Sequence, residues 1–377
     1  MTSRHHLLQN LPIDLNRISL SDWNELFDLL GLGSETKRKV YEGIFHQAVT
    51  CVDDLPGLSG EERQTLREKV VIQSPVRDRL LQSRDRSFKL TLRLHDGRLA
   101  ETVLIQEWEN SRLRKCSASI SSQIGCFFGC SFCATGQMGF HRNLTTGELL
   151  AQVREAERIA KEELNTRLTH LYFMGMGEPM HNYRAMSDVL TIMRDEAAPG
   201  PPPDKITVST VGLYRQIRML AIDHPKVRLA VSVHSANQDM RYSIMPISAR
   251  LSLPEIRDAL VYHNRRTGNT ATIQYLLLGN FNDRADDAEK LVSWLNGLPA
   301  AVTLIAYNNI PGSPAVRSDI AKIKSFQNIL QNAKIPTDIR WCYGEDIDAG
   351  CGQLQSKPGG DRTSVSIRHH SGAVATH

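Results

Sequence analysis

The chain has 377 residues, of which 41% are hydrophobic and 23% charged, so it can bury a sizeable core in two domains or in one large domain with an extension. Its formal net charge of +4 is compatible with nucleic-acid binding but does not require it. No early apolar run resembles a signal peptide, and no run of about 18 apolar residues could span a bilayer, which favours a cytoplasmic protein without membrane segments. Its seven cysteines, an odd number, argue against a disulfide scaffold and favour thiols used for metal binding or chemistry.

The N-terminal part of the chain, residues 1–85, is expected to form a small helical domain. Apolar residues recur at helical spacing over Leu15–Leu30, with Ser21-Asp22 as the expected cap, and a second helix is expected over Lys37–Val49. The capping-box pattern of Ser59–Glu62 predicts the start of a third helix. Scattered basic residues of this domain could contact phosphates, although a solvated helix face is the more common role for them: Lys37, Arg38, Lys39, Arg67 and Lys69.

Residues 86–111 are expected to form a β-hairpin that links this domain to the rest of the chain. Polar and apolar residues alternate over Ser87–Leu94, and Leu99–Ile105 has a second strand-like pattern. Asp96-Gly97 lies between them and is typical of a tight hairpin turn.

Residues 112–354 have the pattern of an α/β core. The capping box of Thr145–Glu148 predicts a helix that runs to about Glu163. Helices, including Asn182–Glu196 and Ala285–Leu298, alternate with short apolar segments that predict strands: Leu168–Met174, Ile206–Thr210, Val227–His234, Thr272–Leu278 and Thr303–Tyr307. Repeated β-α units imply a parallel sheet, either open or closed into a barrel. The tail, residues 355–377, is rich in Gly, Ser, His and Arg and is expected to be disordered.

Three cysteines stand close together in "GCFFGCSFCATG", residues 125–136. Cys126, Cys130 and Cys133 have the spacing C-x3-C-x2-C, with glycines that allow the loop to fold around a bound group. Structural metal sites and most iron–sulfur clusters take four protein ligands. Three thiolates leave one iron of a cubane open for a small molecule, as in a catalytic metal site. Three incidental core cysteines at this spacing are the weaker interpretation.

This spacing resembles the signature of radical S-adenosylmethionine (SAM) enzymes, and "SSQIGCFFGCSFCATGQMGFHRNLTTGEL", residues 121–149, resembles the RlmN/Cfr family of RNA methyltransferases. The resemblance implies a partial (β/α)6 radical SAM barrel with an N-terminal helical domain and a β-hairpin extension. It also implies a [4Fe–4S] cluster with three cysteine ligands, whose fourth iron binds SAM and whose electron cleaves SAM to a 5′-deoxyadenosyl radical. The implied reaction is methylation of an adenine carbon in ribosomal RNA, transfer RNA or both.

Polar residues follow four of the predicted strands, where ligands bind in β/α folds. Each of them alone would more often be a satisfied core or turn residue, but four strand ends in order favour a binding site. By resemblance to the family, the SAM-binding residues are Gly177 and Glu178 in "MGMGEP", Ser209 in "TVSTVG", Ser232, Val233 and His234 in "AVSVHS", and Asn308 in "AYNNIPG". His234 is expected to act as a hydrogen-bonding wall rather than as a base.

The carbon that would be methylated and the methyl group of SAM are both electrophilic, so direct transfer is mismatched, and the family uses covalent catalysis. The motif "GEDIDAGCGQL", residues 344–354, matches the family and places Cys351 at the position that carries the methyl group as S-methylcysteine. By the same resemblance, Glu101 would accept the proton of the adenine ring. An exposed incidental thiol and a surface glutamate are the alternatives.

The sequence departs from the family at the residue that resolves the crosslink between protein and RNA. The family has a cysteine seven residues before the first cluster cysteine, and Ser119 occupies that position here. Cys116 or Cys342 could replace it, an external thiol could do so, or the enzyme could act on another substrate or stall. If residues 116–122 are extended, Cys116 lies on the opposite face of the strand from Ser119. The run "WCYGED" also replaces a stretch that carries a basic residue in the family.

The leading hypothesis is a radical SAM RNA methyltransferase that acts as a monomer and takes electrons from flavodoxin or ferredoxin. Its RNA phosphates would be held by the N-terminal domain, the hairpin and four basic residues: Arg112, Arg114, Lys115 and Arg142. One alternative is a radical SAM enzyme of the same fold that acts on a peptide or small molecule. Another is an RNA-binding protein stabilised by zinc or by a cluster.

Overall fold

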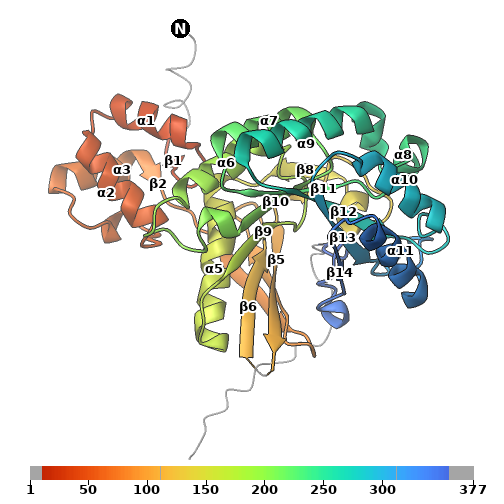
Figure 1. The fold of residues 1–377 in the computed structure, drawn as a ribbon. Coiled ribbons are helices and arrows are strands. Elements are labelled where there is room, and N and C mark those ends of the chain that lie inside the picture. The colour runs from red at the N-terminus through yellow and green to blue at the C-terminus, as the bar shows by residue number, and fades with distance from the viewer. Residues whose placement is uncertain (1–10, 111, 311, 356–377) are drawn as a thin grey trace, which may run out of the picture.

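The computed structural model describes residues 11–110, 112–310 and 312–355, and its centre is a ten-stranded sheet. The strand order is β14-β13-β12-β11-β10-β9-β6-β5-β4-β3 (Figure 1). Neighbours from β6 to β14 pair in parallel, whereas β5, β4 and β3 extend the sheet from β6 in antiparallel pairing. The expected α/β architecture is therefore confirmed.

The parallel part alternates strands with helices, as the apolar pattern predicts. Its strands are β6 Arg112–Ser119, β9 His170–Phe173, β10 Ile206–Thr210, β11 Arg228–Ser232, β12 Ala271–Leu277, β13 Ala300–Ala306 and β14 Thr337–Arg340. Its helices are α4 Ala134–Gln137, α5 Thr146–Leu164, α6 Tyr183–Ile192, α7 Tyr214–Asp223, α8 Gln238–Ile244, α9 Leu253–Thr267, α10 Ala285–Leu295 and α11 Ile320–Asn332. The capping box at the start of α5 is confirmed, since Glu148 and Thr145 bond each other's backbone amides. A short antiparallel pair, β7 Gln123–Gly125 and β8 Phe140–Asn143, frames the cysteine loop.

The N-terminal segment forms helices α1 Leu20–Leu29, α2 Ser34–Phe45 and α3 Gly60–Lys69, which lie beside α5 and α6 (Figure 1). A parallel pair of two-residue strands, β1 Ile13–Asp14 and β2 Val70–Val71, joins their ends. The capping box of α3 is confirmed, but the expected cap of α1 is wrong: Ser19 caps that helix by accepting from the Asp22 amide at 3.3 Å.

The expectation that residues up to 85 are helical is also wrong, because β3 Val76–Gln82 is a strand. It pairs with β4 Phe88–Arg93, which pairs with β5 Leu99–Glu109. The hairpin is thus confirmed, but it continues the central sheet and does not stand apart from it. Buried residues from the N-terminal helices and from the sheet form one continuous core. The division of the chain into separate domains stays a prediction.

The C-terminal segment crosses from the edge strand β14 to the turn between β3 and β4, at the other end of the strand order. The Gly344 amide donates to Asp85 at 2.7 Å, and the Arg84 amide donates to Asp346 at 3.1 Å. Lys89 on β4 donates to the Asp348 carbonyl at 3.1 Å. The sheet therefore curls, and residues 341–355 cover the opening between its two edges. The tail beyond residue 355, expected to be disordered, lies outside the described residues.

Candidate active site

A cavity of about 600 Å³ opens at the carboxyl ends of the parallel strands, where a β/α fold binds ligands. It is lined by residues from the end of every parallel strand, from the cysteine loop and from the C-terminal segment. Of the residues selected from sequence for the cluster, for SAM binding and for catalysis, those that line it are Cys126, Cys130, Cys133, Gly177, Glu178, Ser209, Ser232, His234, Asn308 and Cys351. Val233 and Glu101 do not.

Short-range backbone contacts shape the cysteine loop. Gly125 at its start has φ +72°, and a side chain there would lie 1.8 Å from the Gly139 carbonyl oxygen, so only glycine fits. The Cys126 amide donates to that carbonyl at 3.0 Å, and the Ser131 amide donates to the Ile244 carbonyl at 3.0 Å. These bonds fix both ends of a loop whose three thiols reach the same cavity.

The three thiols of the cysteine loop line one cavity and could serve as ligands of a cluster. Burial raises the pKa of Cys126 to about 12 and that of Cys130 well above its usual value, so bound metal charge is needed to hold both as thiolates. Within the described residues, no three His, Cys, Asp or Glu side chains are arranged to hold one metal ion. Three thiols around one cavity fit a cubane, in which each sulfur binds a different iron.

Glu178 joins the ends of β9 and β10. Its carboxylate accepts from the Met180 amide at 3.0 Å and from the Val211 amide at 2.9 Å. Burial raises the pKa of Glu178 to about 7, and these backbone hydrogen bonds oppose the shift. Gly177 has φ +90° and packs against Gln123, whose side-chain oxygen accepts from the Glu178 amide at 2.9 Å. The carboxylate is thus held in place on the cavity wall.

Two serines share one partner across three neighbouring strands. Ser209 on β10 and Ser232 on β11 both donate to the side-chain oxygen of Gln274 on β12, at 2.8 and 3.2 Å. The Gln274 amide nitrogen in turn contacts the Met174 sulfur at 3.5 Å. All four side chains line the cavity, and Gln274 fixes how the two hydroxyls point.

The imidazole of His234 is neutral and forms part of the cavity wall. Its Nδ1 accepts from the Leu276 amide at 3.0 Å, which leaves the ring proton on Nε2. Burial, assisted by the nearby Arg241 cation, lowers the pKa of His234 to about 3. Its ring also meets Phe132 of the cysteine loop edge-on at 5.1 Å. The neighbouring Val233 is fully buried in the main core, so its side chain does not reach the cavity.

Asn308 connects the end of β13 to the C-terminal loop. Its amide donates to the Cys351 carbonyl at 3.2 Å, and its side-chain oxygen accepts from Arg317 at 3.1 Å. The same loop bonds α4, because the Gly352 carbonyl accepts from the Ala134 amide at 2.8 Å. Cys351 is exposed to the cavity, and desolvation by the surrounding protein raises its pKa to about 11. The thiol thus faces the space that the cluster cysteines line.

Glu101 lies on β5 beneath the C-terminal loop. It is buried and pairs with Lys89 at 3.1 Å, and burial raises its pKa against the effect of that cation. Lys89 also donates to the Asp348 carbonyl at 3.1 Å. The residues on the same face of β5 that do line the cavity are Val103, Ile105 and Glu107. A role of Glu101 as proton acceptor therefore requires the C-terminal loop to move.

The three candidates for a second thiol or hydroxyl near Cys351 have different environments. Ser119, at the end of β6, lines the cavity. Cys116, three residues earlier, is completely buried in the main core, as expected for the opposite face of the strand. Cys342, just after β14, lines the cavity.

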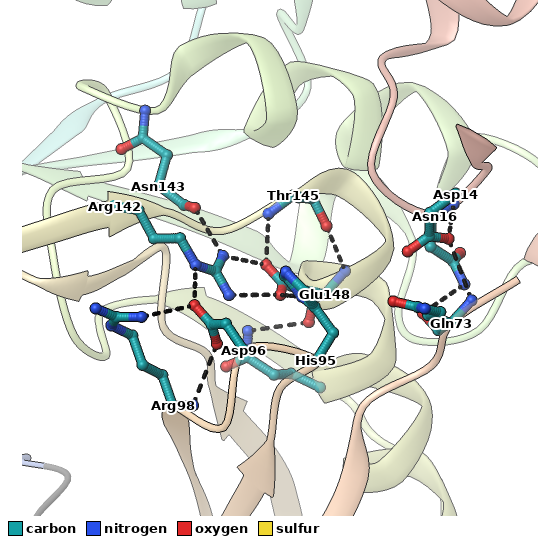
Figure 2. Close-up of polar contacts among 11 residues, drawn as sticks. Asp14, Asn16, Gln73, His95, Asp96, Arg98, Arg142, Asn143, Thr145 and Glu148 are labelled. Atoms are coloured by element: carbon teal, nitrogen blue, oxygen red, sulfur yellow. Dashed lines mark hydrogen bonds and ion pairs between the residues drawn. The ribbon is translucent and has the colours of Figure 1, made fainter. Parts of the chain in front are cut away.

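Of the four basic residues selected for RNA binding, Arg142 has a structural role. Figure 2 shows it between Asp96 of the hairpin turn and Glu148 of α5. It donates to both Glu148 oxygens at 2.7 and 2.8 Å and to Asp96 at 2.8 Å, and its guanidinium lowers the pKa of Asp96. Lys115 pairs with Glu107 at 2.6 Å at the cavity wall, and Arg114 pairs with Glu109 at 3.0 Å. Arg112 is exposed.

Comparison with known proteins identifies the family. Residues 120–295 match the model of the radical SAM superfamily. A probable dual-specificity RNA methyltransferase RlmN from Salinibacter ruber is 36% identical over 85% of this chain and 87% of its own length. A protein of that name from Dictyoglomus turgidum is 36% identical over 91% of this chain and 97% of its own. The crystal structure of a radical SAM methyltransferase from Sphaerobacter thermophilus superposes with a TM-score of 0.80, at 35% identity over 91% of this chain and 99% of that one.

The chain belongs to the RlmN family. Membership in this radical SAM family implies SAM and a [4Fe–4S] cluster as cofactors. Among the described residues, no helix has both the length and the apolar character needed to cross a membrane.

Several cavity residues that this RlmN-family fold brings together carry little signal in the sequence. Gln274 and Tyr172 lie within strands, and Arg340 ends β14. A polar side chain inside the otherwise apolar segment "TIQYLLL" was the signal for Gln274. Tyr172 has the Lys115 and Arg340 cations at 5.4 and 5.6 Å from its ring centre, an arrangement that depends on strand order and could not be read from spacing.

Proposed function

We propose that this chain methylates an adenine carbon in RNA, with Cys351 as the residue that carries the methyl group. The observation that carries the proposal is that Cys351 lines the same cavity as Cys126, Cys130 and Cys133 and as the polar strand ends. A thiol in that position can meet both SAM and a substrate base. The names of the similar RlmN proteins support RNA as the substrate.

The cysteine loop would hold the cluster, and the strand ends would hold SAM. A [4Fe–4S] cluster bound there would supply the electron that cleaves SAM. Glu178, fixed by two backbone amides, places negative charge on the wall that would face the SAM ammonium or ribose. Ser209, Ser232 and the backbone after β11 would contact other polar groups of SAM, while His234 would offer its Nε2 proton as a hydrogen-bond donor.

Cys351 would first act as a nucleophile towards the methyl group of SAM. Its sulfur forms a bond to the methyl carbon, the bond from that carbon to the SAM sulfur breaks, and the thiol proton leaves to solvent or a base. Since desolvation raises the pKa of Cys351 to about 11, the thiolate needs stabilisation, and the nearby Arg340 cation favours it. Asn308 positions the loop through the Cys351 carbonyl.

A base of double-stranded RNA cannot enter this cavity, so the target adenosine would be unpaired or flipped out of its stack. Aromatic and cationic side chains line the cavity on the side of β9 and β14, among them Tyr172, Arg340 and Trp341. Such side chains stack on bases and contact phosphates. We place the reaction in the cytoplasm of the cell, in a monomer that receives electrons from flavodoxin or ferredoxin.

The test is analysis of modified nucleosides in RNA from cells with and without the protein, together with reconstitution under anaerobic conditions. The wild type should methylate an RNA adenine carbon, and Cys351→Ala should not. Cys51→Ala, which removes an exposed thiol of the N-terminal segment, should be fully active. Methylation by Cys351→Ala, or an unmodified Cys351 after incubation with SAM and reductant, would contradict the proposal. Modification of a peptide or small molecule without RNA binding would favour the alternative substrate class.

A further inference from the structure

Two free cysteines outside the cluster loop, Cys342 and Cys351, line the active-site cavity. Of the other two cysteines, Cys116 is buried in the core and Cys51 lies exposed in the N-terminal segment. Ser119 lines the cavity but offers a hydroxyl, which cannot form a disulfide. Among the described residues, Cys342 is therefore the thiol outside the cluster loop that shares the cavity with Cys351.

The loop that separates the two cysteines is closed on itself. The Gly344 carbonyl accepts from the Ile347 amide at 3.2 Å and from the Ala349 amide at 2.8 Å. Cys342 lies two residues before Gly344, and Cys351 lies two residues after Ala349. This closure shortens the path along the backbone between the two cysteines. Desolvation is the main cause of the raised pKa of Cys351, and the Cys342 thiol adds to it.

A continuous chain of hydrogen bonds also links the two residues. The Cys351 carbonyl accepts from Asn308, and the Asn308 side-chain oxygen accepts from Arg317. The same Arg317 nitrogen donates to the Cys342 sulfur at 3.2 Å. Arg317 is itself held by the Tyr307 carbonyl at 2.6 Å and by Glu345 at 2.8 Å. Burial raises the pKa of Cys342, and the Arg317 guanidinium at its sulfur opposes that shift and favours the thiolate, which is the attacking form in thiol exchange.

We propose that Cys342 is the resolving residue: it attacks the Cys351 sulfur and releases the methylated product as a Cys342–Cys351 disulfide forms. This inference rests on the proposed function, in which Cys351 becomes joined to the adenine ring through a methylene group. The position of Ser119 in the same cavity suggests that the second thiol has moved from β6 to the end of β14 in this chain.

The step is balanced without an external oxidant. A sulfur–sulfur bond forms, the bond from the Cys351 sulfur to the methylene carbon breaks, and the electron pair of that bond passes to the carbon. The electron-poor adenine ring stabilises this charge, and the proton from the Cys342 thiol completes the product methyl group. Both sulfurs are oxidised and the carbon is reduced. A dithiol reductant must then reduce the disulfide before the next turnover.

The decisive experiment compares Cys342→Ser with the matched control Cys51→Ser in anaerobic turnover with RNA, SAM, reductant and a dithiol. Cys342→Ser should yield less than one product per enzyme and accumulate a covalent adduct between RNA and Cys351, whereas Cys51→Ser should turn over like the wild type. Ser119→Cys in the Cys342→Ser background should restore turnover. Such rescue would show that Cys342→Ser fails because it lacks a thiol and not because its loop is damaged. Multiple turnovers by Cys342→Ser at the wild-type rate, with Cys351 methylated, would overturn this inference alone. An unmethylated Cys351 in the wild type would overturn the proposed function as well.

A second readout does not depend on turnover. Both cysteines fall in one tryptic peptide that begins at Trp341, so cleavage after Glu345 is needed to separate them. Mild oxidation of the cluster-loaded wild type with diamide, followed by this digestion and mass spectrometry, should recover the two halves joined by a disulfide. A small-molecule dithiol in the same sample shows when oxidation is complete. If both cysteines are then still free thiols, or if Cys351 is found in a disulfide with another cysteine, the assignment is contradicted.

Discussion

The Glu178 carboxylate accepts a hydrogen bond from the Val211 amide at 2.9 Å and thereby ties the end of β9 to the end of β10. Its other oxygen accepts from the Met180 amide at 3.0 Å. Both oxygens are thus engaged by backbone donors in a buried position. A residue selected from sequence as a ligand contact therefore also holds the cavity wall together.

Because the Glu178 carboxylate accepts from two backbone amides, Glu178→Gln tests its structural role directly. Glutamine can satisfy one of the two amides with its oxygen, but its NH2 group must then face the other N–H donor. We expect the variant to lose about 1–3 kcal/mol in its free energy of unfolding, measured by urea denaturation, because one buried amide is left without an acceptor. Glu163→Gln, at an exposed position of α5, should change the free energy of unfolding by less than about 0.5 kcal/mol. Equal stabilities of the two variants would contradict the prediction.

The shared bonds of Gln274 give a second prediction. Gln274→Leu removes the acceptor of Ser209 and Ser232 while keeping the approximate size of the side chain. If these hydroxyls contact SAM, their loss of orientation should weaken SAM binding about tenfold, corresponding to about 1.4 kcal/mol. Isothermal titration of the cluster-loaded protein measures this. Unchanged SAM affinity of Gln274→Leu would indicate that the two serines do not contact SAM. Unchanged affinity of the double variant Ser209→Ala/Ser232→Ala would then establish that they make no contact.

Arg142 provides a third prediction, because the structure gives it a different role from the one expected from sequence. Arg142→Ala removes the arginine that pairs with the buried Glu148 and leaves Asp96 with Arg98 alone, so we expect a loss of about 2–4 kcal/mol in the free energy of unfolding. Arg98→Ala removes a more exposed partner of the same Asp96 and should cost less than about 1 kcal/mol. Urea denaturation of the two variants makes the comparison.

The same variants separate structural from RNA-binding arginines. The salt dependence of RNA affinity, measured by fluorescence anisotropy, should be unchanged in Arg142→Ala at temperatures where the variant is folded. Arg112→Ala, at an exposed position of β6, should reduce the slope of log affinity against log salt by about 1 if that residue contacts a phosphate. A reduced slope in Arg142→Ala with unchanged stability would instead support the original expectation.

The sequence was sufficient to predict those features of the fold and site that depend only on neighbouring residues. The spacing of Cys126, Cys130 and Cys133 and the capping box at Thr145 depend only on neighbouring residues, and the strands that carry Ser209 and Ser232 have clear apolar patterns. The cap of α1 was misplaced by two residues because several residues near Ser19 have side chains able to cap.

What could not be predicted depends on contacts between distant segments. Arg142 is isolated as a basic residue in the sequence, and its partner Asp96 comes from a turn 46 residues away. The chain from Cys351 through Asn308 and Arg317 to Cys342 likewise needs the curled sheet to bring β13, β14 and the C-terminal loop together. Strand spacing already placed Cys116 on the opposite face from Ser119, which its burial in the core confirms, but only the fold shows that Cys342 reaches the cavity.

His224 gives the last prediction, which concerns the pH dependence of stability. The residue follows α7, is buried, and accepts from Arg194 at Nδ1 over 2.9 Å, so its Nε2 proton is donated to Ser187 at 2.7 Å. Burial, together with the Arg194 cation, lowers the pKa of His224 to about 4, and Asp223 opposes the shift. The imidazole is therefore neutral in the folded protein at neutral pH.

Because an unfolded histidine has a pKa of about 6.5, the unfolded state binds more protons than the folded state between about pH 6.5 and pH 4. The free energy of unfolding should thus fall as pH falls through this window, by up to about 3 kcal/mol from this residue. His224→Asn should reduce the slope, measured by urea denaturation at several pH values, whereas His141→Asn at an exposed position should leave it unchanged. A slope in His224→Asn equal to that of the wild type would show that the buried imidazole is not the group that titrates.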